Sequence, residues 1–351
     1  MNKIRVVHML CSNSYSGAEN VVCQIVNMFK EDATYEFVYA SPDGRIRDAL
    51  EKRGILFAPM KDATLSEFKR VIKEINPSIV HAHDMRASFL AALACGNIPM
   101  VSHVHNNNFD SQKPTIKAFL YRYAAIKAKH IFWVSQSSFD GYFFHKGLGK
   151  KSTVLYNVID ANQLVERANE APLQTPYDIV YVGRLTYQKN PQRLINVLGS
   201  IVSQKPEVKC ALIGTGDLEE EVKGLIKIKK LENNIDFLGF QSNPYGILKN
   251  AKIMIMTSRW EGTPMCALEA MALGIPIVST PTDGLKELVD NGITGFLDDE
   301  DSKIRDDCVR IVLDDEMRNN FSNATLQKSR QMMELKKYHH QLKQIYTKYA
   351  R

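Results

Sequence analysis

Short apolar runs alternate with segments of helical periodicity along most of the chain, and this alternation restricts the fold more than any other feature. Residues 4–10 form a short apolar run, a small polar loop follows, and residues 18–29 place apolar side chains at helical spacing. Parallel strands need a crossover between them, and a helix supplies it. The pattern therefore predicts an α/β fold with a doubly wound parallel sheet.

The alternation runs in two series, separated by a polar stretch at residues 161–176 that contains Pro172 and Pro176. The first series has expected strands at residues 4–10, 36–40, 78–83, 100–105, 130–134 and 153–156, and helices at 18–29, 46–53, 65–75 and 87–94. The second has expected strands at 178–182, 208–213, 235–238, 253–257 and 277–279, and helices at 191–203 and 218–229. We expect two domains, residues 1–165 and 166–330, and a basic helical segment at 331–351. Each domain is long enough to bury its own core, so a cleft between domains is available as an active site.

Composition excludes several classes of protein. No apolar run approaches the roughly 20 residues that cross a bilayer, and residues 1–10 lack the apolar length and cleavage site of a signal peptide. The six cysteines show no C-x-x-C or Cys/His ligand spacing, which argues against a zinc site or a disulfide framework and favours a reducing cytoplasm. The formal charge of +6 suits anionic ligands of several kinds and selects none.

The segment SRWEGTPMCALEAMALGIP, residues 258–276, holds the most informative residues. Glu261 and Glu269 flank a loop-to-helix transition, and Gly262 and Pro264 suit the turn that opens the helix. Backbone N–H groups and the positive end of the helix dipole at residues 262–266 would suit a diphosphate or sugar hydroxyls. Glu269, two turns into the helix, is placed to accept from ribose hydroxyls. Taken alone, each glutamate also fits an ordinary solvated helix residue.

A second segment, YVGRLTYQKN at residues 181–190, places Arg184 and Lys189 directly after the first strand of the second series. Open α/β sheets bind ligands at the carboxyl ends of their strands. Arginine can make two parallel bonds to phosphate oxygens, and lysine acts as a mobile point charge. Either residue alone fits a surface cation, but together with Glu261 and Glu269 they indicate a pyrophosphate site.

These motifs carry a resemblance to a known family. The E-x7-E segment, the GRL-x3-KN loop, Gly214-Thr215-Gly216 after a strand and Leu238-Gly239-Phe240 resemble the retaining nucleotide-sugar glycosyltransferases of the GT-B fold, which include capsule, exopolysaccharide and lipopolysaccharide enzymes. The similarity covers nearly the whole chain in the expected order. It implies two Rossmann-like domains facing a cleft, with the acceptor bound by residues 1–165, the nucleotide-sugar by 166–330, and the helix at 331–351 crossing back to the first domain.

The amino-terminal half departs from the family pattern at one turn. The family shows G-G-x-E after the first strand, and this chain has Ser16-Gly17-Ala18-Glu19, so Gly17 alone provides close backbone approach. The run VSHVHNN resembles the strand that ends in the family's active-site histidine, which we align with His105. Alternation along a strand places His103 on the same face, so His103 stays open as the alternative.

The resemblance implies a role for each of these residues. His105 would lie beside the donor sugar near its reacting carbon, Arg184 and Lys189 would neutralise the leaving diphosphate, Glu261 would contact sugar hydroxyls, and Glu269 would hold the ribose. Such charge stabilisation needs no metal and no cofactor, and front-face transfer of the acceptor's proton to the leaving group would give retention. UDP is the nucleotide that the resemblance implies. The remaining expected donor-binding residues are Gly17, Gly183, Gly214, Phe240, Gly262, Thr263, Pro264 and Met265.

Weaker patterns have simpler interpretations beside them. Gly214-Thr215-Gly216 opens like a dinucleotide fingerprint, but Glu219 occupies the third glycine position, which favours a plain turn. Phe240 fits a ring bordering the nucleobase or a core aromatic equally well. His81 and His83 share a strand face near Asp84, but no third metal ligand is visible in the sequence, so a satisfied strand-end pair is favoured over a metal cluster.

Residues 113–130 have the pattern of an interfacial helix. Apolar residues on one helical face are flanked by lysines and an arginine, which suits anionic head groups at the inner face of the cell membrane, where related enzymes meet lipid-linked acceptors. An amphipathic helix packed on the sheet would give the same pattern. The apolar face comprises Ile116, Phe119, Leu120, Tyr123 and Ile126.

The combined patterns favour transfer of a sugar to a saccharide or lipid-linked acceptor in cell-surface polysaccharide synthesis. A nucleotide-sugar epimerase shares the fold but is not expected to carry both the E-x7-E and GRL-x3-KN segments. A non-catalytic nucleotide-sugar-binding protein is a further alternative. Nucleic-acid binding is not expected, because basic and aromatic residues do not interleave in a stripe.

Overall fold

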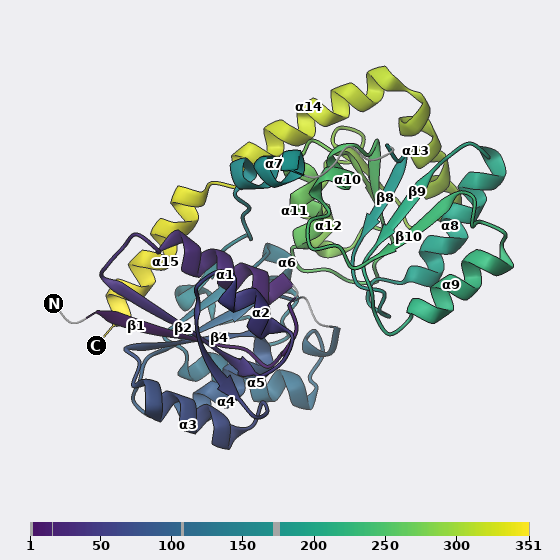
Figure 1. Cartoon of the computed structure of the whole chain (residues 1–351). Coiled ribbons are helices and arrows are strands. Elements are labelled where there is room, and N and C mark those ends of the chain that lie inside the picture. The colour runs from purple at the N-terminus through teal and green to yellow at the C-terminus, as the bar shows by residue number, and fades with distance from the viewer. Residues whose placement is uncertain (1–2, 16, 107–108, 171–175, 351) are drawn as a thin grey trace. The chain divides into compact units, whose positions relative to one another are not determined.

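The structure is a computed structural model that describes residues 3–15, 17–106, 109–170 and 176–350. The chain forms two compact units (Figure 1), one of Met1–Asn157 with Leu335–Arg351 and the other of Val158–Glu334. Each unit is built on one parallel sheet, of seven strands in the first unit and six in the second. The predicted α/β class with two doubly wound sheets is confirmed.

The first sheet has the order β3-β2-β1-β4-β5-β6-β7, and every pair is parallel. The strands β1, β4 and β5 at its centre are almost wholly buried, as strands covered on both faces by crossover helices are. The strands are β1 (Ile4–Met9), β2 (Tyr35–Pro42), β3 (Leu56–Met60), β4 (Ile79–His83), β5 (Met100–Val104), β6 (His130–Trp133) and β7 (Ser152–Val154). The helices are α1 (Gly17–Met28), α2 (Ile46–Glu51), α3 (Leu65–Ile75), α4 (Asp84–Ala94), α5 (Ile116–Lys127), α6 (Gln136–Asp140) and α15 (Leu335–Tyr349), with 3₁₀ turns at Phe109–Ser111 and Gly149–Lys151.

The second sheet has the order β10-β9-β8-β11-β12-β13, again wholly parallel. The chain order reverses between β8 and β11, and open sheets of this kind bind ligands at such a switch point. The strands are β8 (Ile179–Val182), β9 (Cys210–Ile213), β10 (Ile235–Gly239), β11 (Ile253–Met256), β12 (Ile277–Ser279) and β13 (Gly295–Leu297). The helices are α7 (Ala161–Glu170), α8 (Pro191–Gln204), α9 (Glu219–Ile228), α10 (Tyr245–Lys249), α11 (Met265–Ala272), α12 (Asp283–Leu288), α13 (Asp301–Leu313) and α14 (Asp315–Met332).

The division between the units lies at Asn157 and Val158, whereas the sequence pattern placed it between residues 165 and 166. Helix α7 explains the difference, because it packs on α10 and α11 of the second unit. Arg167 of α7 also donates to the backbone oxygen of Ser242, at 2.9 Å. The polar composition of α7 reads as a linker in sequence, although its contacts make it part of the second unit.

The carboxyl-terminal helix α15 belongs to the first unit, as expected, and begins at Leu335 rather than at residue 331, because α14 continues to Met332. In Figure 1 it lies beside α1 and β1. Lys343 pairs with Asp32 at 2.7 Å, and the Tyr346 hydroxyl lies 2.7 Å from Nδ1 of His81. These contacts tie the end of the chain to the sheet of its first half.

Two edge strands, β3 and β13, were not among the predicted strands. Pro59 lies in β3 and lacks a backbone donor, which a strand tolerates at a sheet edge. In β13, Gly295 has a positive φ of 158°, and an added Cβ would lie 1.9 Å from the Ile277 backbone oxygen. Short strands with proline or glycine give weak sequence patterns, so both were missed.

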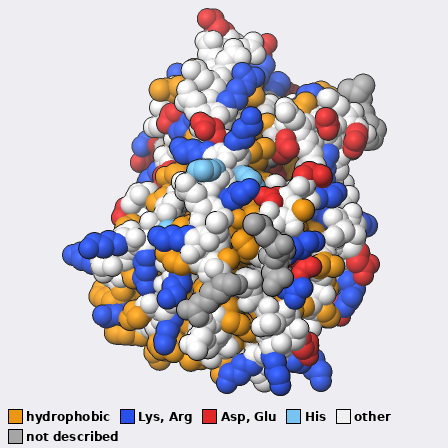
Figure 2. Space-filling view, turned by 90° about the vertical axis from the view of Figure 1, so that its left-hand side faces the viewer, with side chains coloured by type: hydrophobic (Ala, Val, Ile, Leu, Met, Phe, Trp, Pro, Cys, Tyr) orange, Lys and Arg blue, Asp and Glu red, His pale blue; other side chains and the backbone are white. Residues whose placement is uncertain are grey.

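Among the described residues, no helix is both long and apolar enough to cross a membrane. Figure 2 shows one face of the molecule, on which lysine and arginine side chains are distributed among acidic and hydrophobic ones. All six cysteines carry free thiols.

Candidate active site

Lys189 and Glu261 form a buried ion pair in the second unit. Nζ of Lys189 lies 2.6 Å from Oε1 of Glu261, and the two side chains are 11% and 5% exposed. Lys189 lies in the loop after β8, and Glu261 in the loop after β11. The hydroxyl of Thr257, at the end of β11, donates to the backbone oxygen of Asn190, at 3.2 Å, and joins the two loops. The switch point of the sheet therefore holds a paired cation and anion.

Opposing effects set the charge of Lys189. Burial alone lowers the pKa of its ammonium, but the Glu261 carboxylate and its hydrogen bond outweigh burial, so the pKa is raised. Lys189 is therefore charged at neutral pH, and a full positive charge stands in a buried position. Such a charge is costly unless a partner compensates it.

Arg184, the other predicted phosphate cation, is exposed on the same loop. The charge of Arg184 acts to lower the pKa of Lys189, so the two cations lie within electrostatic reach of one another. The Tyr181 hydroxyl donates to the backbone oxygen of Arg184, at 3.0 Å, and fixes the start of the loop. The loop thus presents one buried cation that is paired with Glu261 and one exposed cation, Arg184.

Glu269 is a buried residue of α11 rather than a solvated one. The Tyr245 hydroxyl donates to its Oε1 at 3.1 Å. Burial raises the pKa of Glu269 to about 7, although the Tyr245 hydrogen bond and the charge of Arg167 both act to lower it. The Arg167 guanidinium lies 4.6 Å from the centre of the Tyr245 ring. A carboxylate held in this way is poised to accept hydrogen bonds from a ligand's hydroxyls.

The segment that opens α11 is enclosed within its unit. Gly262, Thr263, Pro264 and Met265 are all buried, and Pro264 is the N-cap residue in an extended conformation. Burial raises the pKa of the neighbouring Cys266 thiol to about 11, and the charge of Lys189 acts to lower it. The positive end of the α11 dipole and the Lys189 ammonium are thus within electrostatic reach of the same short segment.

Glycines let the loops of this unit approach one another backbone to backbone. At Gly214, φ is 135°, and an added Cβ would lie 1.9 Å from the backbone oxygen of Gly183. An added Cβ at Gly284 would lie 1.4 Å from the backbone oxygen of Gly262. Sequence reasoning selected Gly183, Gly214 and Gly262 and missed Gly284. Phe240, at the end of β10, is 67% exposed, which excludes the core interpretation of its ring.

In the first unit, His105 follows β5 directly. The rings of His103 and His105 stack with centroids 4.2 Å apart, so the expectation that they share a face is confirmed. His103 is fully buried, whereas His105 is 7% exposed and lies at the strand's end. Asp84 accepts from the His105 backbone N–H at 3.1 Å and has a left-handed φ of 68°. Gly17 is the exposed first residue of α1, and Ser16 lies outside the described residues.

The expected strand-end pair of His81 and His83 is part of a larger histidine cluster. His8 of β1, together with His103 and His105, lies against the pair, and two trios place one ring nitrogen of each member within 4.8 Å of the others. Burial lowers the pKa of all five rings. The trios are His8, His81 and His83, and His83, His103 and His105.

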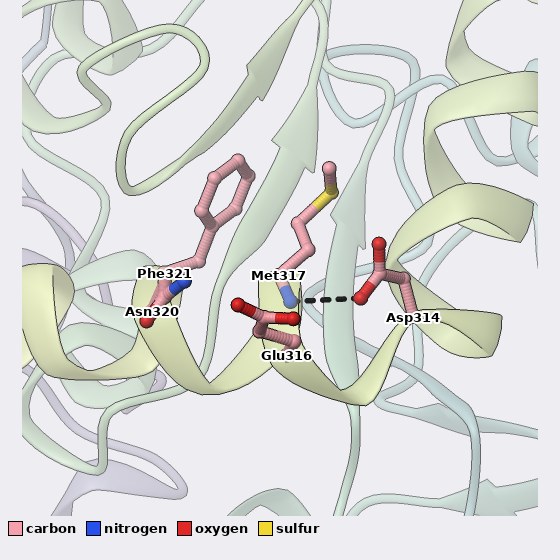
Figure 3. A pocket seen from close by; sticks show the side chains of 5 residues that line it. All are labelled: Asp314, Glu316, Met317, Asn320 and Phe321. Carbon is pink, nitrogen blue, oxygen red and sulfur yellow. Dashed lines mark hydrogen bonds between the residues drawn. The ribbon is translucent and has the colours of Figure 1, made fainter.

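The predicted residues therefore fall into two groups. Arg184, Lys189, Glu261 and Glu269 belong to the second unit, and His105 and Gly17 belong to the first. The pocket drawn in Figure 3 lies elsewhere, at the start of α14, where Asp314 caps the helix by accepting from the Met317 backbone N–H at 2.9 Å. It is lined by Asp314, Glu316, Met317, Asn320 and Phe321, none of which is a predicted site residue.

Two family models match the chain in succession. The model described as Glycosyltransferase Family 4 matches residues 15–163, and the model described as Glycosyl transferases group 1 matches residues 162–328. Each model covers a little less than half of the chain, and both describe glycosyltransferases. Both models describe transferases, so the epimerase and non-catalytic alternatives are not favoured.

The curated relatives of this chain are distant in sequence. The UDP-Gal:alpha-D-GlcNAc-diphosphoundecaprenol alpha-1,3-galactosyltransferase of Escherichia coli is 24% identical over 361 residues, covering 92% of this chain and 93% of that protein. An uncharacterized glycosyltransferase of Methanocaldococcus jannaschii is 28% identical over 236 residues, covering 60% of this chain, and the match spans 57% of that protein. The crystal structure of Anabaena Alr3699/HepE in complex with UDP-glucose superimposes with a TM-score of 0.84 at 19% identity, covering 98% of this chain and 99% of that one. This last likeness establishes the GT-B fold.

Sequence reasoning missed Arg167, which lies beside Tyr245, and Gly284, which lies against Gly262. It considered His83 and Asp84 as metal candidates and missed that both contact His105. Gly284 follows Asp283 at the start of a helix, a position where a glycine is a usable signal of close approach. No local signal points to Arg167, because it lies in the segment that reads as a linker.

Proposed function

We propose that this glycosyltransferase transfers a sugar from a UDP-sugar to a saccharide or lipid-linked acceptor in cell-surface polysaccharide synthesis. In this proposal the anomeric configuration is retained, and neither a metal nor a cofactor takes part. The observation that carries the proposal is the buried Lys189–Glu261 pair beside the exposed Arg184 and the segment that opens α11. This arrangement places two cations, one of them paired with Glu261, and the amino-terminal end of α11 at the ligand-binding edge of the second sheet.

Departure of the nucleoside diphosphate builds negative charge, which fixed cations and helix N–H groups stabilise without reorganising. Arg184 would bind phosphate oxygens from the solvent side, and Lys189 would share its charge between Glu261 and the diphosphate. The second oxygen of Glu261 would then accept from a hydroxyl of the donor sugar. The leaving phosphate would take the acceptor's proton on the same face of the sugar, which gives retention.

The nucleoside would lie at the α11 and β10 side of this unit. Glu269, held by Tyr245, would accept from the ribose hydroxyls, and the exposed ring of Phe240 would border the base. Gly183, Gly214, Gly262, Thr263, Pro264 and Met265 complete the proposed donor site. In the first unit, the proposed site residues are His105 and Gly17.

The identity of donor and acceptor rests on the relatives. The E. coli relative is named for a UDP-galactose donor and a diphosphoundecaprenol-linked acceptor, and the Anabaena structure contains UDP-glucose. We therefore place this chain among enzymes that use a UDP-sugar and a saccharide on a polyprenyl diphosphate.

Helix α5 supports contact with a membrane surface, the site at which a lipid-linked acceptor would be found. The face of α5 that packs on its unit comprises Ala118, Tyr121, Ala124 and Ala125. The predicted apolar face points away from the unit instead, with Ile116 79% and Ile126 62% exposed. Apolar side chains flanked by lysines suit the interface of an anionic bilayer. We propose a cytoplasmic location at the inner face of the cell membrane.

The direct test is an assay of the purified chain with UDP-sugars and a polyprenyl-diphosphate saccharide, with and without EDTA. We expect a glycosylated product whose new linkage keeps the donor's anomeric configuration by NMR, at the same rate in EDTA. Lys189→Ala should lose turnover, and Lys229→Ala, which changes an exposed lysine at the end of α9, should not. Interconversion of UDP-sugars without transfer to an acceptor would contradict the proposal.

A further inference from the structure

Arg259 lies in the loop after β11, two residues before Glu261, and its side chain reaches the loop after β8. Its Nε donates to the backbone oxygen of Tyr187 at 3.1 Å, and its Nη2 donates to Oδ1 of Asn190 at 2.9 Å. Tyr187 and Asn190 lie on either side of Lys189 in the sequence. One guanidinium therefore binds the chain both before and after the lysine of the proposed diphosphate site.

Further contacts join the same two loops. The Arg259 backbone N–H donates to the backbone oxygen of Gln188 at 2.8 Å, and Nε2 of Gln188 donates to the backbone oxygen of Trp260 at 3.0 Å. The Arg259 guanidinium also lies 4.2 Å from the centre of the Tyr187 ring, a distance at which a cation is attracted to an aromatic face. The two loops are therefore joined over several consecutive residues.

The side chain of Asn190 serves the contact between the loops. Asn190 is the N-cap residue of α8, a position at which an asparagine side chain commonly accepts from the N–H groups of its own helix. Among the described residues, the Asn190 side chain makes no such cap bond and accepts from Arg259 instead. Its backbone is left-handed, with a φ of 53°, which asparagine tolerates better than most residues. Both the backbone and the side chain of Asn190 are thus suited to receive Arg259.

Arg259 is exposed, whereas Lys189 and Asn190 are buried. A guanidinium presents its N–H groups in fixed directions, so it can bond two acceptors at once in one defined geometry. A lysine ammonium carries the same charge on a flexible stem and does not reproduce this geometry. The contacts of Arg259 therefore indicate that it fixes the position of the loop, beyond supplying a charge.

We propose that Arg259 is a positioning residue that fixes the loop after β8, so that the Lys189 ammonium meets both Glu261 and the leaving diphosphate. The inference rests on the proposed role of Lys189 and extends it to a residue outside the predicted site. The Lys189 ammonium lies at the end of a flexible stem, so its position depends on how firmly the loop is held. A displacement of about 1 Å at a reacting centre can lower a rate roughly 100-fold.

Two substitutions separate the geometry of Arg259 from its charge. Arg259→Ala removes both side-chain hydrogen bonds and leaves in place the backbone bond to Gln188 and the hydrogen bond of Thr257, so the loops still meet. Arg259→Lys keeps the positive charge and loses the paired N–H groups. If Arg259 acts by positioning, both variants should be impaired. Wild-type behaviour of Arg259→Lys would show that only the charge matters and would overturn the inference.

Arg318 of α14 offers a matched control in the same unit. Its Nη1 donates to the backbone oxygens of Ile311 and Val312 of α13, at 3.0 and 3.2 Å. Arg318→Ala therefore also removes a guanidinium that joins two segments, but neither segment carries a residue of the proposed site. We expect UDP binding and transfer by Arg318→Ala to match the wild type. Melting temperatures of all the variants check that each one is folded.

The test is calorimetric titration of the full chain with UDP, followed by transfer kinetics on the same samples. Arg259→Ala and Arg259→Lys should raise the Kd for UDP and lower kcat, each roughly 10- to 100-fold, as for other residues that orient a binding group through a neighbour. A partly unfolded sample would bind less UDP per molecule of protein at an unchanged Kd. The Kd therefore distinguishes positioning from a general loss of structure.

A double-mutant cycle shows whether Arg259 acts through Lys189. If it does, adding Arg259→Ala to Lys189→Ala should change the Kd for UDP by less than about twofold, because residues that act as a unit are not additive. A further loss as large as the loss in the wild-type background would overturn the inference, since Arg259 would then act on the ligand directly.

Failure of this inference and failure of the proposed function give different results. If Lys189→Ala weakens UDP binding and both Arg259 variants bind UDP as the wild type does, the inference fails and the proposed role of Lys189 stands. If Lys189→Ala itself binds UDP and transfers sugar like the wild type, the role of Lys189 fails and the inference fails with it. If the wild type transfers no sugar but the cycle follows the prediction, the proposed function fails and the positioning role stands.

Discussion

At the residue scale, the site is defined by charges that the protein buries and then compensates. Lys189 would be unstable in its position without Glu261, and Glu261 would be equally unstable without Lys189. Sequence reasoning identified both residues as candidates but gave them separate ligand contacts. Their direct pairing requires the loops after β8 and β11 to meet, which depends on strand order rather than on local sequence.

Mutations of the Lys189–Glu261 pair can separate its effect on stability from its effect on activity. Lys189→Ala leaves a buried carboxylate without its partner and should lower the free energy of unfolding by about 3–5 kcal/mol. The double variant Lys189→Ala with Glu261→Gln removes the stranded charge, so most of that loss should return in urea unfolding. Transfer activity should stay low in both. Activity that returns with stability would assign the pair a structural role alone.

Glu269 predicts a pH dependence of donor binding. Its carboxyl accepts from ribose hydroxyls most strongly when it is ionised. Burial raises its pKa to about 7, although the Tyr245 hydrogen bond and the charge of Arg167 act to lower it. As pH falls through about 7, protonation competes with donor binding, so the Kd for UDP should rise, up to tenfold per pH unit below the pKa. Calorimetric titrations of wild type and Glu269→Gln from pH 5.5 to 8.5 check this. The variant should bind weakly with a flatter profile, and a wild-type profile as flat as the variant's would count against this role.

Asp84 combines a left-handed backbone with a buried carboxyl that holds the His105 N–H. An asparagine side chain would keep the acceptor and tolerate the backbone, so Asp84→Asn should be close to neutral, whereas Asp84→Ala should cost about 1–2 kcal/mol. Burial raises the pKa of Asp84 to about 6, above its value in the unfolded chain. Its contribution to stability should therefore fall as pH rises from about 4 to about 6. Chemical unfolding should show that the free energy of unfolding of wild type falls across that range relative to that of Asp84→Asn. Identical pH profiles of the two proteins would refute this prediction.

At the element scale, periodicity predicted the interior elements well and the edges poorly. Helix α3 and strand β12 have the predicted bounds, because their apolar patterns are strong and clearly delimited. The edge strands β3 and β13 were missed, since exposure and a proline or glycine weaken their patterns. The face of α5 that packs on the unit was also not predicted, because it is made of alanines and one tyrosine.

The exposed face of α5 predicts binding to anionic vesicles. Ile116→Ser with Ile126→Ser removes two apolar side chains that contact no core and should lower the vesicle-bound fraction about tenfold or more without changing the melting temperature. Ile228→Ser is the matched control, because Ile228 of α9 is 79% exposed, as Ile116 is. Cosedimentation with vesicles containing phosphatidylglycerol measures the effect. An equal loss of vesicle binding in the control, or no loss in the double variant, would contradict membrane binding by α5.

At the scale of the whole molecule, the two sheets and the packing of α15 on the first unit could be predicted from the sequence. Which residues far apart in the sequence come together could not. The order β1-β4-β5 brings five histidines into one layer, and β8 beside β11 brings Lys189 to Glu261. A pattern along the chain predicts strands and their faces. Which strands become neighbours is a property of the folded sheet, and the supporting residues Arg167, Gly284 and His83 become apparent only there.

The central claim is that the leaving diphosphate is bound by cations of the loop after β8 together with the segment that opens α11. A crystal structure of the chain with UDP tests it most directly. We predict phosphate oxygens within hydrogen-bond distance of Arg184 and Lys189, with the ribose hydroxyls on Glu269. A UDP molecule whose phosphates contact neither cation would contradict the account.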